Sequence, residues 1–216
     1  MKNIIIASNN QGKITEFEHQ FSGHEGISII GQQQLSVQEV PETGHTFVEN
    51  ALIKARNAAR CSGMPAIADD SGIMVDALNG APGIYSARFG GANTTDQNNN
   101  EKLLLAMEDI PSGQRSAYYT CVLVFLRNPM DPSPIICQGV WHGEILQTPR
   151  GDSGFGYDPL FYIPELDCSA AELSKEQKNQ LSHRGRAMRE LIPQIEQALA
   201  HIPAAQAHAD SCSCCH

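Results

Sequence analysis

The N-terminal segment changes abruptly from apolar to polar positions. Residues 2–7 form an apolar run that is too short and too uniform for an amphipathic helix, so it predicts a buried strand. A polar hexapeptide at residues 8–13 follows at once, and residues 13–21 then place their apolar side chains on one side of a short helix. Residues 26–31 predict a second short strand, followed by a polar loop.

A longer amphipathic pattern begins at Thr46. Thr46 and Glu49 match a capping box, in which a Thr cap is followed three residues later by Glu. Apolar residues then recur at helical spacing, which predicts a helix of about four turns that ends near Gly63. Residues 65–72 predict a short strand that runs into an acidic turn.

The second half of the chain predicts an antiparallel pair. Residues 115–126 are rich in aromatic and β-branched side chains, and residues 134–146 follow them across a turn. The glycine- and asparagine-rich residues 77–100 are expected to be mostly loop, and residues 101–110 helical. The remaining expected elements are a glycine loop at 148–159, a short strand at 160–164 and helices at 173–181 and 182–201. Together these elements predict a mixed α/β fold with a partly antiparallel central sheet flanked by helices.

Length and charge limit the functions to consider. The chain has 216 residues, of which 41% are hydrophobic, so it can bury a core; we expect one domain over residues 1–202. The net charge of -9 argues against nucleic-acid binding, which needs a basic face. We expect neither a signal peptide nor a membrane span, and therefore a cytoplasmic protein. Residues 203–216 form a tail that we expect to be disordered, although Cys212, Cys214, Cys215 and His216 could instead bind a soft metal.

The hexapeptide between the first strand and the first helix is a candidate phosphate site. It lacks the spacing of a P-loop and of a dinucleotide fingerprint, since no glycine precedes Gly12 at the required distance. A helix N-terminus nevertheless offers free N–H groups, Gly12 permits close approach, and Lys13 adds positive charge. The alternative is an ordinary strand–helix turn in which Ser8, Asn9 and Asn10 cap the helix.

Two adjacent carboxylates, Asp69 and Asp70, follow the third predicted strand. In an extended strand their side chains would point to opposite faces, so one can be structural while the other faces a cleft. Carboxylate oxygens suit Mg²⁺, and a carboxylate at such a site can deprotonate a water molecule. Glu42 is a possible second metal ligand. The alternative is a solvated turn or helix cap.

Two further clusters lie near the C-terminal end. In the loop around Phe155, glycines would let the backbone approach a flat ligand, Phe155 and Tyr157 could stack on a base, and Asp158 could accept hydrogen bonds. His183 and Arg184 stand in the first turn of the last predicted helix, where positive charge opposes the helix dipole and so suggests a negative or electron-rich partner. The alternatives are a glycine turn with core aromatics and a solvated helix start.

Six segments together carry a resemblance that none carries alone. SNNQGK, ETGHTFVENALIKA, PAIADDSG, APGIYSARF, GFGYDP and SHRGRA occur in an order and at spacings that resemble the inosine triphosphate pyrophosphatase family, over about residues 1–200. The resemblance implies an elongated α/β structure with a long central sheet and two lobes around a substrate cleft, assembled as a homodimer. It also implies hydrolysis of ITP, dITP and XTP to the monophosphate and pyrophosphate, with Mg²⁺.

The resemblance also implies roles for individual residues. Asp70 is the expected proton acceptor and a metal ligand. Glu42 is a weaker second ligand, because Pro41-Glu42 stands where many relatives have two acids. Donors from Arg184 or His183 would select a 6-oxo purine. The expected substrate-binding residues are Ser8, Asn9, Asn10, Gln11, Gly12, Lys13, Lys54, Ser71, Phe155, Gly156, Tyr157, Asp158, Lys178, His183 and Arg184.

Two other functions stay open at the level of the sequence. One is a pyrophosphatase for other modified nucleotides, for example of pyrimidine type. The other is a nucleotide-binding regulator without turnover, which would need the phosphate turn but not Asp70.

Overall fold

The computed structural model describes residues 2–24 and 26–200, and these residues build a seven-stranded sheet of order β2-β1-β3-β4-β5-β6-β7. β1 pairs in parallel with both β2 and β3, while all pairings from β3 onward are antiparallel. The sheet therefore confirms the mixed α/β class. Its strands are β1 (Lys2–Ile6), β2 (Ile27–Gly31), β3 (Ala66–Val75), β4 (Ser116–Leu126), β5 (Ile135–Ile145), β6 (Phe161–Ile163) and β7 (Cys168–Ser169).

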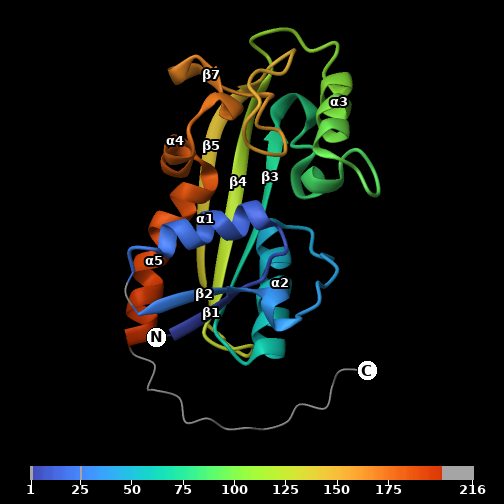
Figure 1. The fold of residues 1–216 in the computed structure, drawn as a ribbon. Helices are drawn as coiled ribbons and strands as arrows, with labels where there is room; N and C mark the ends of the chain where they lie inside the picture. Colours follow the sequence, from blue (N-terminus) through green and yellow to red (C-terminus); the bar gives the residue numbers. More distant parts are fainter. Residues whose placement is uncertain (1, 25, 201–216) are drawn as a thin grey trace.

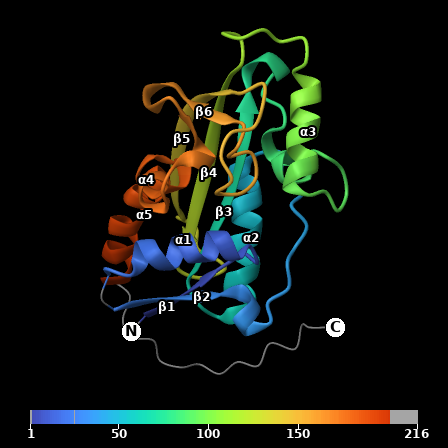
Figure 2. The same cartoon turned by 45° about the horizontal axis from the view of Figure 1, so that its top comes forward.

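Five α-helices surround the described part of the sheet. Figure 1 shows the long strands β3, β4 and β5 running through the molecule, and Figures 1 and 2 both show α1 crossing in front of them. A 3-10 helix, η3 (Gly83–Arg88), follows β3 and packs against it. The α-helices are α1 (Gln11–Phe21), α2 (Phe47–Ser62), α3 (Asp96–Ala106), α4 (Lys175–Leu181) and α5 (His183–Ala200).

Alternation along the long strands creates a core on each face of the sheet. Ile67 on β3 and Leu123 on β4 contribute to one core, which α1 and α5 cover with residues such as Phe17 and Leu191. The intervening strand positions face α2, whose buried alanines let the helix approach the sheet closely. A third core, at the other end of the sheet, contains aromatic residues of β4 and β5 together with α3 side chains.

The strand that carries the two aspartates was predicted too short. β3 continues as regular strand to Val75, and Asp69 and Asp70 lie in its middle, paired with Leu123 and Val122 of β4. The predicted acidic turn is therefore wrong. Ten consecutive residue pairings with β4 hold these polar residues in extended conformation, a tertiary effect that overrides the turn preference of Asp, Ser and Gly.

The region between β3 and β4 also differs from the prediction. α3 begins at Asp96 and ends at Ala106, so the helix predicted for residues 101–110 starts five residues too late. Thr95 caps it by accepting a hydrogen bond from Asn98 N at 3.2 Å. Asparagines are poor helix formers, which is why this first turn reads as loop in the sequence.

Other boundaries agree with the pattern. α2 begins after Thr46, which accepts a bond from Glu49 N, and ends before Gly63 in left-handed conformation, as the capping box and the glycine predict. α1 begins at Gln11, two residues earlier than expected. Pro193 lies inside α5 without ending it. The tail at residues 203–216 lies outside the described residues, so the predictions for it stay predictions.

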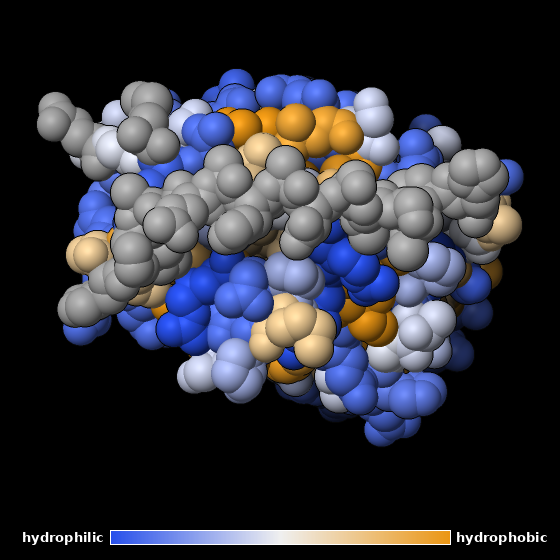
Figure 3. All heavy atoms as spheres, turned by 90° about the horizontal axis from the view of Figure 1, so that it is seen from below, coloured by the Kyte–Doolittle hydropathy of each residue, from blue (hydrophilic) through white to orange (hydrophobic). Residues whose placement is uncertain are grey.

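The lower end of the molecule, opposite β7, is seen directly in Figure 3. In the visible part that the described residues form, hydrophobic residues (orange) appear as separate patches between hydrophilic ones (blue). Over the described ranges, no helix is both long and apolar enough to cross a membrane.

Candidate active site

A cavity of about 640 Å³ opens beside the middle of β3. β1 pairs with β3 only as far as Ile67, and the next β-bridge along that edge in the described residues joins Met74 to Pro82. Side chains from both faces of β3 can therefore border one opening across the strand edge. The volume lies in the range of about 300–1,000 Å³ that is typical of small-molecule sites.

The polar turn before α1 forms one wall. Asn10 caps the helix by accepting from Lys13 N at 3.0 Å, and its own N–H donates to Ser8 Oγ at 3.2 Å. Asn9 Oδ1 accepts from Gln32 Nε2 at 2.9 Å, so its side chain stabilises the turn. Of the six predicted residues, Ser8, Asn10 and Lys13 line the cavity, whereas Asn9, Gln11 and Gly12 are not among its lining residues.

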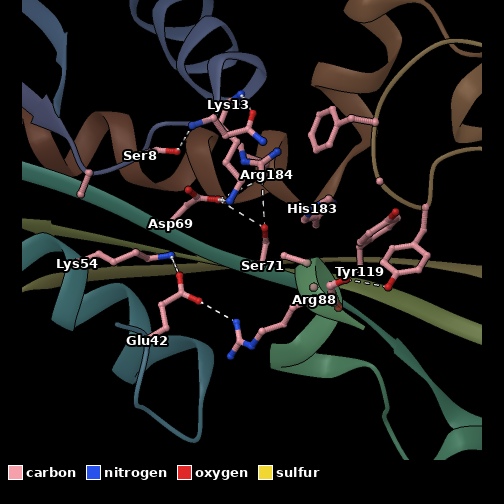
Figure 4. A pocket seen from close by; sticks show the side chains of 18 of the residues that line it. Ser8, Lys13, Glu42, Lys54, Asp69, Ser71, Arg88, Tyr119, His183 and Arg184 are labelled. Carbon is pink, nitrogen blue, oxygen red and sulfur yellow. Dashed lines mark hydrogen bonds and ion pairs between the residues drawn. The ribbon is translucent and has the colours of Figure 1, made fainter. Parts of the chain in front are cut away.

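Asp69 joins this turn to the start of α5. It is 1% exposed and lies 2.9 Å from Lys13 Nζ and 3.1 Å from Arg184 Nη2 (Figure 4). Arg184 also donates to Glu16 at 2.7 Å and to Ser71 Oγ at 3.2 Å. Burial raises the pKa of Asp69, but the charges of Lys13 and Arg184 outweigh that effect and hold the pKa well below its usual range. Asp69 is thus an ionised, structural carboxylate.

Asp70 points to the opposite face of β3, as alternation predicts. Lys54 Nζ lies 3.5 Å from Asp70 Oδ1 and 2.6 Å from Glu42 Oε1, and Arg88 reaches Glu42 at 3.5 Å. Figure 4 shows Lys54, Glu42 and Arg88 of this second chain of charges below β3, with the Asp69 cluster above it. Burial raises the pKa of Asp70, and the nearby charge of Glu42 adds to this while Lys54 opposes it. A carboxyl group with a raised pKa is suited to accept a proton.

Asp70 and Glu42 have the chemistry of a magnesium site. Among the described residues Asp70 Oδ2 is buried without a hydrogen-bond partner, and Glu42, which lines the cavity, is linked to Asp70 through Lys54. Mg²⁺ commonly takes one or two protein carboxylates and completes its shell with water and substrate phosphates. The donor set fits that pattern, although residues 2–24 and 26–200 contain no group of three metal-binding side chains.

The glycine loop at residues 154–158 forms another wall of the cavity. The Tyr157 hydroxyl and the Asp158 carboxylate, which the sequence suggested for ligand binding, already have hydrogen-bond partners within the protein. Tyr157 is 4% exposed, and its hydroxyl donates to the Ser86 carbonyl at 2.8 Å, so it anchors the loop and its ring is largely buried. Asp158 Oδ2 accepts from Phe155 N at 2.8 Å and from Lys178 Nζ at 2.5 Å. The Lys178 ammonium also lies 4.3 Å from the centre of the Phe155 ring.

His183 lies on an aromatic floor at this side of the cavity. Its ring stacks on Tyr119 with centroids 4.6 Å apart and planes 8° apart. α5 can begin so close to the sheet because β5 has Gly139 there: a Cβ atom would lie 1.9 Å from the His183 carbonyl oxygen. Burial, followed by the charges of Arg184 and Lys178, holds the pKa of His183 well below its usual value, so the imidazole is neutral. Its Nδ1 atom has no hydrogen-bond partner in the part of the chain that the structure describes.

The cavity therefore has two chemically different ends. We call the groups around β3 the charged end, and the groups around the glycine loop the aromatic end. The charged end consists of Lys13, Glu42, Lys54, Asp69, Asp70 and Arg88. The aromatic end consists of Tyr119, Phe155, Gly156, Tyr157, Asp158, Lys178 and His183.

Sequence reasoning missed several lining residues. Asp69 was left without a specific partner, and Arg88, Tyr119, Ser86 and Asp96 were not singled out, although all of them line the cavity. Arg88 and Ser86 stand within one of the segments that carried the resemblance, so a signal was present for those two. Of the predicted residues, Asp70 lies behind Lys54 and is not itself a lining residue.

An α/β protein with an open sheet edge, paired acids and lysines at one end of a cavity and aromatic rings at the other belongs to the class of small-molecule enzymes that bind anionic, partly aromatic ligands. Comparison with known proteins narrows this class. The Ham1 family matches residues 4–194, and the chain belongs to that family.

Individual relatives match over nearly their whole length. The dITP/XTP pyrophosphatase of Vibrio cholerae is 53% identical over 197 residues, which cover 91% of this chain and 98% of the relative. The dITP/XTP pyrophosphatase of Photorhabdus laumondii is 52% identical over 92% of this chain and 100% of its own length. The structure of a HAM1 protein from Coxiella burnetii superposes with a TM-score of 0.86 at 47% identity, covering 91% of this chain and 100% of that one.

Proposed function

We propose that this chain hydrolyses non-canonical purine nucleoside triphosphates, namely ITP, dITP and XTP, to the nucleoside monophosphate and pyrophosphate. The single observation that carries the proposal is the cavity, which pairs a charged end with an aromatic end around one open strand edge. Relatives about half identical in sequence are dITP/XTP pyrophosphatases, which supports the same class of substrate.

The triphosphate would occupy the charged end. Lys13, Lys54 and Arg88 are the cations that line this part of the cavity, and Asn10, the N-cap of α1, lines it too. Lys54 is held between Glu42 and Asp70. Burial lowers the pKa of Lys54, but the charges of Asp69, Asp70 and Glu42 outweigh that effect and raise it, so Lys54 stays protonated. These cations can exchange part of their present pairing for phosphate oxygens when the substrate binds.

Asp70 would act as the general base. Its unpartnered Oδ2 can take a proton from a water molecule, whose oxygen then attacks the α-phosphorus. The bond between that phosphorus and the bridging oxygen of the β-phosphate breaks, and pyrophosphate leaves with its charge held by Lys13 and Arg88. Mg²⁺ bound by Asp70 and Glu42 would supply further neutralisation of phosphate charge.

The base would lie at the aromatic end, where the His183 ring stacks on Tyr119. Both terminal nitrogens of Arg184 already donate to protein oxygens, at Glu16, Asp69 and Ser71, while its Nε has no hydrogen-bond partner among the described residues. His183 is neutral and its Nδ1 is also unpartnered there, and because its ring belongs to the aromatic end it is the candidate we favour to hydrogen-bond a purine edge. A site built for one hydrogen bond rejects a base that leaves it unmade, by several orders of magnitude in favourable cases.

The proposal extends to features that the resemblance alone suggested. We expect a homodimer, as the resemblance implies, and a single domain over residues 1–202. We also expect the nucleotide to be the functional ligand, with no role for nucleic acid or a membrane.

A substrate panel tests the proposed reaction. The protein is incubated with ITP, dITP, XTP, ATP, GTP and dTTP in the presence of Mg²⁺, and phosphate is detected with and without added inorganic pyrophosphatase. Phosphate from ITP, dITP and XTP only in the coupled assay supports the proposal. Phosphate without coupling would indicate a phosphatase, preference for dTTP a different nucleotide specificity, and binding without turnover a regulator.

A further inference from the structure

The first turn of α3 holds the glycine loop by the backbone of one residue. Asp96 Oδ2 accepts a hydrogen bond from Gly156 N at 2.7 Å, and Asn100 Nδ2 donates to the Gly156 carbonyl at 2.9 Å. Asp96 and Asn100 are four residues apart, so they lie on one side of the helix. Both hydrogen-bonding groups of Gly156, which has a φ of +63°, are thus fixed by a helix about sixty residues away in the chain.

This contact is not explained by the stability of α3. Thr95 already caps the helix, and Leu103 and Met107 anchor its later turns in the core. Asp96 is an exposed residue that lines the cavity together with Gly156. We call the two hydrogen bonds from Asp96 and Asn100 to Gly156 the clasp. The clasp therefore fixes the loop and the cavity wall that the loop forms.

The clasp also decides what the loop can bind. The N–H of Phe155 donates to Asp158, and the N–H of the next residue, Gly156, donates to Asp96. Two consecutive N–H groups could otherwise form an anion-binding nest. Since protein carboxylates occupy both, this loop offers its aromatic ring rather than its backbone donors to a ligand.

We propose that Asp96 and Asn100 are positioning residues for the nucleoside part of the substrate. They fix Gly156, and Asp158 fixes Phe155 from the other side, so the Phe155 ring stands in place before a nucleotide arrives. This inference rests on the proposed function for the identity of the ligand. Because the reacting phosphorus lies at the other end of the cavity, loss of the clasp weakens substrate binding and leaves the chemical step unchanged.

The test compares Asp96→Ala and Asn100→Ala with two reference variants. Asp96→Asn keeps an oxygen acceptor for Gly156 N and should rescue most of the effect. Gln97→Ala changes the neighbouring residue of the same helical turn, whose exposed side chain donates a hydrogen bond to Glu101 at 2.9 Å. All variants are measured for amide hydrogen exchange in residues 153–158 without nucleotide, for KM and kcat with ITP, and for thermal unfolding.

We expect Asp96→Ala to speed exchange in the loop and to raise KM about tenfold, the scale of losing one charge-assisted hydrogen bond, with kcat unchanged. Gln97→Ala should change neither. Faster exchange with an unchanged KM would overturn the positioning role, and unchanged exchange would overturn the clasp itself. If the wild type shows no turnover, the proposed function fails, while the exchange data still decide whether the clasp exists.

Discussion

The two ends of the cavity are built on different physical principles. At the charged end, Asp69 and Asp70 occupy successive positions of one strand, yet opposing surroundings lower the pKa of the first and raise that of the second. At the aromatic end, the histidine is neutral and the loop is fixed by hydrogen bonds from three separate elements. At the charged end, ion pairs that can be exchanged balance the charges. At the aromatic end, hydrogen bonds hold the loop and its rings in a fixed position.

This difference separates catalysis from selection. Phosphoryl transfer depends mainly on positioning and on stabilisation of developing charge, which the charged end can supply by exchanging its internal ion pairs for phosphate. Discrimination between purines depends on hydrogen bonds and stacking in a rigid wall. Substitutions at the two ends should therefore change different measured quantities, and the following variants test that separation.

The largest expected effect is that of Asp70→Asn. An amide cannot accept the proton of the attacking water, so kcat should fall roughly 10²–10⁴-fold. The affinity for inosine monophosphate, held at the aromatic end, should change little, which calorimetry can measure beside turnover of ITP. The midpoint temperature of thermal unfolding should be unaltered or slightly higher, since burial disfavours the ionised carboxylate. Turnover at the wild-type rate would remove Asp70 from the mechanism.

The second effect concerns Asp69→Asn and should appear mainly as lost stability. Removing the carboxylate leaves Arg184 and Lys13 without their shared partner, which typically costs about 3–5 kcal/mol for a buried pair at neutral pH. Because the folded pKa of Asp69 is lowered, its stabilisation is present above the unfolded pKa of about 4 and is lost as pH falls through the folded value.

Urea unfolding at pH 7 and at several acid pH values checks this sign. The deficit of Asp69→Asn relative to the wild type should be greatest at pH 7 and shrink on acidification. Asp158→Asn is the matched variant from the aromatic end. Burial raises the pKa of Asp158 although the charge of Lys178 opposes this, so the wild type loses stability as the pH rises. The stability deficit of Asp158→Asn relative to the wild type should therefore shrink as the pH rises. The same pH trend in both variants would contradict the contrast between the two ends.

The smallest effect is expected for Tyr157→Phe. The variant loses one hydrogen bond to the Ser86 carbonyl, which should lower the free energy of unfolding by about 0.5–1.5 kcal/mol. Tyr85→Phe is the control. Tyr85 lies in η3, the 3-10 helix that also contains Ser86, and it is 53% exposed. Chemical denaturation measures both. A loss of kcat as large as that of Asp70→Asn would show that the two ends are not separable.

Local patterns in the sequence predicted the elements that local chemistry determines. The capping box at Thr46 and the glycine after Ser62 located α2, and the aromatic and β-branched residues of 115–126 located β4. The order of motifs also identified the segments that form the cavity. For α2 and β4 the signal lies within the element itself, and for the cavity segments it lies in the resemblance to a known family, so no knowledge of the tertiary structure was needed.

The errors occurred where distant residues decide the outcome. β3 passes through the predicted acidic turn because β4, about fifty residues later, pairs with it along its whole length. Distant residues also determine contacts that the site predictions left out. Arg184 lines the cavity as expected, but its carboxylate partners, Glu16 and Asp69, lie 168 and 115 positions away. The hydroxyl of Tyr157, a candidate for base stacking, is bound to a carbonyl of η3. Pairings of this kind cannot be read from a single segment.

The open edge of β3 has a consequence for the aggregation of the protein. Between Ile67 and Met74 the strand lacks a β-strand partner on one side within the described residues, a situation that invites pairing with another chain. Here the charged side chains of Lys13, Lys54 and Arg88 border that gap and oppose the approach of a foreign strand. The groups that suit a polyphosphate therefore also protect the protein from edge-to-edge aggregation.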